Sequence, residues 1–153
     1  MGIMSNRAGE TQPATEHDLA DTRTPAQRRH IMQSVKQADT GPEMIVRRLL
    51  HGMGYRYRLH RKDLPGRPDI VFGGRRKVVF VHGCFWHGHG CDKGQLPKSR
   101  LDYWAPKIEA NMARDQKARR ALEDDRWRVL EVWQCEIGDT RTLAERLVRF
   151  LES

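Results

Sequence analysis

One ten-residue segment constrains this chain more than any other, because residues 82–91 read HGCFWHGHGC and combine two cysteines with three histidines. Thiolate and imidazole are the ligands that Zn²⁺ prefers, and four of them in a closed tetrahedron make a structural site. Cys84, His89 and Cys91 are the natural local ligands, and interleaved glycines allow a tight loop to wrap an ion. Cys135 is the only other cysteine, so we expect it to supply the fourth ligand.

The cysteine count supports this interpretation over a disulfide framework. Three cysteines are an odd number, and the N-terminal residues contain no apolar segment of the kind found in a secretion signal. The alternative is a histidine-rich loop in which the cysteines are incidental. A filled Cys₃His site leaves no open position for water, so we expect this zinc to be structural rather than catalytic.

The bulk composition favours one globular domain. The chain has 153 residues, of which 38% are hydrophobic and 31% charged. No apolar run approaches the roughly 20 residues that a membrane-spanning helix needs. We therefore expect no membrane association and a cytoplasmic location.

The charge is basic and unevenly distributed. The net charge is +8 and the isoelectric point about 9.9. Residues 1–23 carry a net −2, which leaves +10 on residues 24–153. An excess of this size favours a polyanionic partner, because each phosphate contact releases condensed counterions. The alternative is an ordinary solvated basic surface.

Hydrophobic periodicity predicts an α/β domain behind a polar tail. Residues 1–23 lack any apolar period and are expected to be a disordered N-terminal tail, so the domain covers 24–153. Within it we expect helices at 25–36, 41–53, 106–123 and 140–151, and strands at 55–60, 70–72, 77–81 and 126–133. Ile108, Met112 and Leu122 should face inward on the third helix. This order indicates a small mixed β-sheet flanked by helices, with a zinc-bound loop after the third strand.

Several separated motifs resemble those of the bacterial very-short-patch repair (Vsr) mismatch endonucleases. They are LPGRPD at 64–69, VFVHGCFWH at 79–87, the Tyr103-Trp104 pair, Asn111 to Asp115, and WRVLEVWQC at 127–135. The resemblance covers roughly residues 24–150 and implies a restriction-endonuclease-like fold. Such folds usually follow a Pro-Asp pair with a second carboxylate and a lysine, but the second position here reads Phe-Val-His, a departure that the family shares.

The chemistry suggested by these residues is Mg²⁺-dependent hydrolysis of a phosphodiester. Asp69 follows loop prolines and begins a strand, so its carboxylate can hold Mg²⁺ at a sheet edge. His87 has a pKa range suited to a general base near neutral pH. The resemblance implies that the backbone carbonyl of Val81 is a second Mg²⁺ ligand, where the family commonly has threonine. It further implies catalytic roles for His82, Asp115 and Glu43.

Each of these residues also has a plain structural interpretation. Asp69 could be a strand-initiating residue, and His87 a spare zinc ligand. Asp115 could form a solvated ion pair on a helix, and Glu43 could simply favour the dipole of a helix N-terminus.

Aromatic residues in the loop indicate how DNA could be read. Phe85 and Trp86 are hard to bury completely in a glycine-rich loop, and proteins that deform DNA insert such side chains between base steps. The resemblance adds Trp104 as a partner, while the alternative is that all three pack as core residues. Lys107 and Asn111 are weaker candidates for DNA contacts.

The resemblance implies nicking of one strand of double-stranded DNA at a T·G mismatch left by deamination of 5-methylcytosine, as a step of DNA repair. A cytosine methyltransferase and a repair polymerase are expected partners by family analogy, and we expect a monomer. The alternatives are a related nuclease with a different lesion or sequence specificity, a non-catalytic zinc-containing DNA-binding protein, and an RNA-binding protein. Flanking preference and cut position do not follow from the sequence, and Gly88 and Gly90 stand where the family commonly has histidine.

Overall fold

A four-stranded mixed sheet organises the computed structural model, which describes residues 23–35 and 37–153. Its order is β1 (Arg58–Leu59), β2 (Ile70–Phe72), β3 (Lys77–His82) and β4 (Arg128–Trp133). The first three strands are antiparallel, whereas β4 pairs parallel with β3. The predicted mixed sheet is thereby confirmed. The predicted tail lies outside the described residues except for Arg23.

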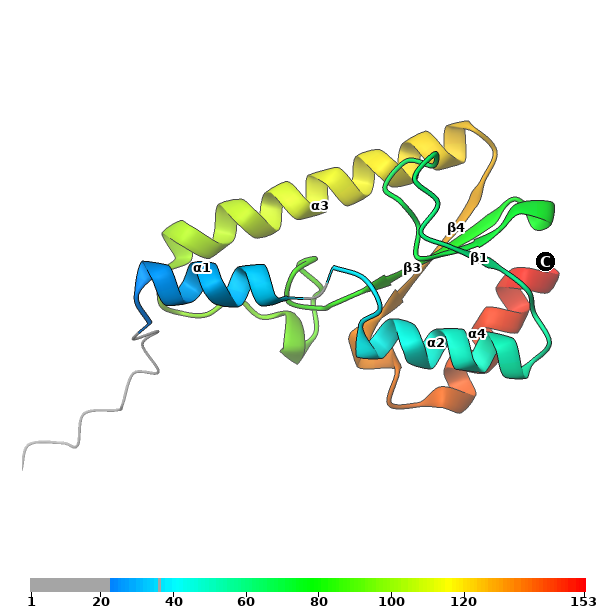
Figure 1. Cartoon of the computed structure of the whole chain (residues 1–153), viewed down its shortest axis with the longest axis horizontal. Helices are drawn as coiled ribbons and strands as arrows, with labels where there is room; N and C mark the ends of the chain where they lie inside the picture. Colours follow the sequence, from blue (N-terminus) through cyan, green and yellow to red (C-terminus); the bar gives the residue numbers. More distant parts are fainter. Residues whose placement is uncertain (1–22, 36) are drawn as a thin grey trace, which may run out of the picture.

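Helices cover both faces of the sheet. Helix α3 (Leu101–Asp124) crosses one face, while α2 (Gly41–Gly52) and α4 (Thr140–Glu152) lie together on the other (Figure 1). Helix α1 (Pro25–Ser34) runs beside the first half of α3. Every residue of β3 is buried, since side chains that alternate along the strand meet a helical layer on either side.

The alternation of β3 divides the core into two clusters. Val79 and Val81 pack with α2 and α4, in a cluster that includes Leu50 and Leu147. Val78 and Phe80 belong to the opposite cluster under α3, with Leu64, Val71, Leu122 and Trp127. The loop that contains Cys84 and Cys91 leaves the end of β3, and α3 then returns the chain to β4, as a parallel connection requires.

Three local expectations were wrong. Helix α3 begins at Leu101 rather than at the expected residue 106, so Pro106 lies inside the helix. Arg100, in a left-handed conformation, directly precedes its first turn. The strand expected at 55–60 is only two residues long and is followed by His60, whose left-handed backbone departs from a strand conformation. Met112 is 47% exposed rather than inward-facing. Among residues 23–35 and 37–153, no helix is long and apolar enough to cross a membrane.

Candidate active site and metal centre

The predicted catalytic side chains line one cleft of about 920 Å³. Its walls come from α2, the segment after β1, the end of β3, the cysteine-containing loop and α3. The predicted residues that it gathers are Glu43, Asp69, Val81, His82, Trp86, His87, Asn111 and Asp115. The fold thus brings together residues separated by more than seventy positions in the sequence.

Asp69 lies immediately before β2, with its side chain 16% exposed. The Val81 backbone N–H donates a hydrogen bond of 2.7 Å to its Oδ2 atom across the β2–β3 pair. Burial raises the pKa of Asp69 to about 6, against the opposing effect of the Val81 N–H, and the Glu43 carboxylate raises it further. Burial and the nearby Glu43 charge disfavour the ionised form of Asp69, and a bound cation would stabilise that form. The oxygen left free by Val81 can hold one.

The rings of His82, the last residue of β3, and His87, in the loop that follows, stack on each other. Their ring centroids lie 4.0 Å apart. The Nδ1 atom of His87 lies 2.5 Å from Oδ2 of Asp115 on α3. Because an ionised carboxylate only accepts, the ring donates from Nδ1, and in the neutral imidazole its Nε2 then carries the free lone pair. Burial, followed by the proximity of His87, lowers the pKa of His82 to about 4, so that ring is neutral at physiological pH.

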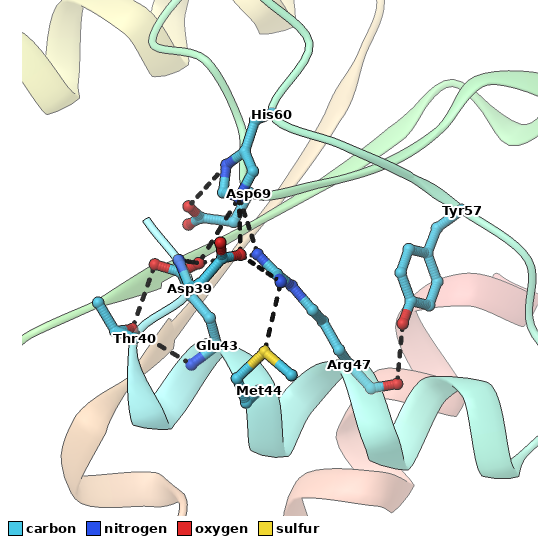
Figure 2. Close-up of polar contacts among 8 residues, drawn as sticks. All are labelled: Asp39, Thr40, Glu43, Met44, Arg47, Tyr57, His60 and Asp69. Carbon is cyan, nitrogen blue, oxygen red and sulfur yellow. Dashed lines mark hydrogen bonds and ion pairs between the residues drawn. The ribbon is translucent and has the colours of Figure 1, made fainter. Parts of the chain in front are cut away.

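Glu43 lines the cleft, and its side chain is held there in a buried ion pair. Its Oε2 accepts from Nη2 of Arg47 at 3.0 Å, and both side chains are less than 10% exposed. Arg47 also donates to Asp39 at 2.6 Å and contacts Nε2 of His60 at 2.8 Å. Figure 2 shows dashed lines that join His60 both to this cluster and to Asp69. Sequence analysis missed Arg47, His60 and Asp39; the left-handed backbone of His60 (φ 44°), which has no sequence signature here, brings its ring to the cleft.

The four predicted zinc ligands converge. One donor atom from each of Cys84, His89, Cys91 and Cys135 lies within 4.8 Å of the others. The Cys135 sulfur and Nδ1 of His89 are 3.5 Å apart. Zinc–ligand bonds of about 2.0–2.3 Å give tetrahedral edges of about 3.6 Å, so this spacing fits a shared ion. The His89 ring is also held by stacking on Trp133, with centroids 4.3 Å apart.

The thiols titrate unequally in this cluster. A hydrogen bond with His89 lowers the pKa of Cys91 to about 6. Burial, with the neighbouring sulfurs of Cys84 and Cys91, raises the pKa of Cys135 to about 11. Deprotonating several neighbouring thiols is unfavourable, because the resulting thiolates repel one another. A divalent cation bound among them offsets this repulsion. The donor set is therefore suited to a soft divalent metal.

The three aromatic residues that we expect to insert between DNA bases form one cluster, of which Trp86 lines the cleft. Phe85 lies 5.0 Å from Trp86 and 5.3 Å from Trp104 between ring centroids, and all three side chains are half-buried. Asn111 donates to the Trp86 carbonyl at 2.8 Å, which anchors the loop to α3. Lys107 lies with Nζ 4.4 Å from the ring centroid of Tyr103. Asn111 therefore supports the aromatic loop, a role that the sequence did not reveal.

Comparison with known proteins places this geometry in context. Residues 20–93 match the model of the family described as DNA mismatch endonuclease Vsr. The type II nicking enzyme V.XorIIP of Xanthomonas oryzae pv. oryzae is 62% identical over 88% of this chain and 98% of its own length. The DNA mismatch endonuclease Vsr of Escherichia coli is 38% identical over 88% of this chain and 86% of its own.

A solved structure supports the fold. The catalytic domain of the homing endonuclease I-Bth0305I matches with a TM-score of 0.53, covering 72% of this chain and 93% of that domain. The two sequences are 20% identical, so the match concerns the fold alone.

Proposed function

This chain belongs to the Vsr family of DNA mismatch endonucleases, and we propose that it nicks one strand of duplex DNA at T·G mismatches left by deaminated 5-methylcytosine. One observation carries the proposal beyond the family: Asp69 and the His87–Asp115 pair face the same cleft. A carboxylate suited to a cation and an oriented base are the two elements that metal-assisted phosphodiester hydrolysis requires.

Asp69 and the backbone carbonyl of Val81 would hold Mg²⁺. The donor chemistry fits, because Mg²⁺ takes oxygen ligands and is commonly bound by one or two carboxylates while keeping several waters. Burial of Asp69 leaves a carboxylate that gains from a nearby cation. When bound, the metal would supply positive charge to the scissile phosphate.

His87 would act as the general base. Its Nε2 atom accepts a proton from the attacking water, while Asp115, at 2.5 Å from Nδ1, stabilises the imidazolium that results. His82 is buried and neutral, and its ring stacks on His87, which restricts the orientation of the base. Glu43 would act from a distance through its ion pair and through its negative charge near Asp69.

The cysteine cluster would hold a structural Zn²⁺. Cys84, His89, Cys91 and Cys135 fill four positions and leave none for water, so the ion would be closed to substrate. The same loop carries the base and two aromatic side chains. The zinc would therefore fix the positions of both functions at once.

Recognition of the mismatch would use the aromatic cluster. Phe85, Trp86 and Trp104 present half-buried rings beside the catalytic cleft. Inserting rings between base steps costs a few kcal/mol of unstacking, and a mismatched step is already weakened. Lys107 and Asn111, on the same helix, would face the DNA backbone. The enzyme would prefer mismatched duplex because unstacking costs less free energy there than at a matched step.

The remaining proposals concern the cellular setting. We infer that the enzyme acts as a monomer in the cytoplasm. A cytosine methyltransferase would be its companion and a repair polymerase would act after it. The two partners follow from the reaction, since a methyltransferase makes the 5-methylcytosine whose deamination leaves the mismatch, and resynthesis follows the nick.

A nicking assay on a labelled duplex with one T·G pair tests the function. We expect a single nick on the T strand with Mg²⁺, none with EDTA, and far less on the matched duplex. Asp69→Ala should abolish nicking without unfolding the protein, whereas Asp63→Ala, at an exposed aspartate of the preceding loop, should not. Cleavage of matched duplex at equal rates would replace mismatch recognition with a general nuclease activity. Tight DNA binding without cleavage would indicate a non-catalytic protein.

A further inference from the structure

His60 links the active-site carboxylate to the buried ion pair of α2. Its Nε2 atom lies 2.8 Å from Nη2 of Arg47, and its Nδ1 atom lies 3.8 Å from Oδ1 of Asp69. The backbone N–H of His60 also donates to the Asp69 carbonyl at 3.4 Å. Both the ring and the main chain of His60 therefore face Asp69 (Figure 2).

The contact with Arg47 fixes the tautomer of His60. A guanidinium has five N–H donors and no acceptor, so Nε2 of His60 must be the acceptor. A neutral imidazole that accepts at Nε2 carries its hydrogen on Nδ1. That hydrogen points toward Oδ1 of Asp69, although 3.8 Å is too long for a hydrogen bond. The contact is therefore electrostatic, and it closes to a bond with a shift of less than 1 Å.

Arg47 is itself held firmly. It donates to Asp39 at 2.6 Å and to Glu43 at 3.0 Å, and its side chain is 9% exposed. The Oε2 atom of Glu43 also accepts from the backbone N–H of Asp39 at 2.9 Å. A guanidinium bonded to two carboxylates cannot rotate away from His60 without leaving a buried charge unpaired. The orientation of the imidazole is thus imposed by α2.

We propose that His60 is a positioning residue for Asp69, with its Nδ1–H tautomer imposed by Arg47. Val81 holds one carboxylate oxygen and His60 faces the other, so that a small closing movement would restrain the carboxylate from both sides. This arrangement resembles the way in which outer partners orient metal-bound groups in other proteins. The inference rests on the proposed role of Asp69 in holding Mg²⁺.

The tautomer can be tested without any metal or substrate. The ¹⁵N chemical shifts of the ring distinguish a protonated from an unprotonated nitrogen, and His60→Gln identifies the His60 signals by their disappearance. We expect Nδ1 of His60 to be protonated and Nε2 to be free in the wild-type protein. Protonation at Nε2 would overturn the proposal, because Arg47 could then not be its donor.

The functional consequence is tested by titrating Mg²⁺ in single-turnover nicking of the T·G duplex. His60→Ala should raise the half-saturating Mg²⁺ concentration by about 10- to 100-fold, with DNA affinity unchanged. His60→Gln should recover most of the loss, since its amide can both accept from Arg47 and donate to Asp69. His51→Ala, at an exposed histidine in the last turn of α2, is the matched control and should have no effect.

An unchanged Mg²⁺ dependence in His60→Ala would refute the positioning role. Equal losses in His60→Ala and His60→Gln would also refute it, since only the packing of an imidazole would then matter. A wild-type enzyme that does not nick the T·G duplex would instead refute the proposed function, and the tautomer measurement would still decide whether Arg47 fixes His60.

Discussion

Gly88 adjoins the proposed general base, and a side chain added there would have to displace neighbouring atoms of α3. Its backbone is left-handed, with φ at +64°. An added Cβ atom would lie 2.5 Å from the sulfur of Met112 and 3.1 Å from Cγ2 of Ile108, both on α3. Gly90 offers a matched comparison within the same loop, since a Cβ atom there would meet nothing within 4 Å.

We expect Gly88→Ala to destabilise the protein by about 2–5 kcal/mol. About 1–2 kcal/mol comes from the left-handed conformation and about 1–3 kcal/mol from overpacking against α3. At roughly 4 °C per kcal/mol, the thermal midpoint should fall by about 8–20 °C, whereas Gly90→Ala should change stability by no more than about 0.5 kcal/mol. Thermal unfolding followed by circular dichroism measures both. Nicking should fall as well, because His87 precedes the strained residue.

A double-mutant cycle separates the two contributions. Met112 is exposed and flexible, so Met112→Ala should remove the closest overlap and recover about 1–2 kcal/mol in the Gly88→Ala background. The backbone cost should remain. A Gly88→Ala protein that melts within about 1 °C of the wild type would refute this reasoning, since neither the left-handed conformation nor the overlap could then exist.

Three other perturbations test the site and the fold. Asp115→Asn should lower the single-turnover nicking rate by about 10²- to 10⁴-fold with DNA affinity unchanged, because it no longer holds His87 in its Nδ1–H form; an unchanged rate would exclude Asp115 from the reaction. Cys135→Ser should lower the zinc content measured by atomic emission and reduce the thermal midpoint, and a folded, active, zinc-free protein would contradict the structural role. Asp139→Ala should be destabilising at pH 7, because Asp139 caps α4. The Thr142 hydroxyl lowers the pKa of Asp139 below its ordinary value of 3.8, so the stabilisation exists above that pH and is lost as the pH falls through the folded-state value. Urea titrations of both proteins at pH 7 and at acid pH should therefore converge, and a constant difference would be inconsistent with the cap.

The sequence predicted candidate ligands well where several reactive residue types lie close together in one short segment. One ten-residue stretch predicted Cys84, His89 and Cys91 as zinc ligands, because few residue types bind zinc and glycines accompany them, and the structure brings their donor atoms together. The mixed sheet and its helices followed from apolar periodicity, since β3 is buried on both faces and α4 on one. Positional errors arose at Pro106, because proline is favoured in a first turn yet is tolerated later in α3.

By itself, the sequence determined the residue types available for chemistry, the order of the elements and the family to which the chain belongs. Only the tertiary structure decided which of these residues act together. His60 adjoins Asp69 because a left-handed backbone at the end of β1 directs its ring to the cleft, and Arg47 meets it from α2, thirteen residues earlier. Such pairings depend on strand register and helix packing, which no local pattern encodes, and through them a histidine in a basic segment comes to lie beside the buried carboxylate of Asp69.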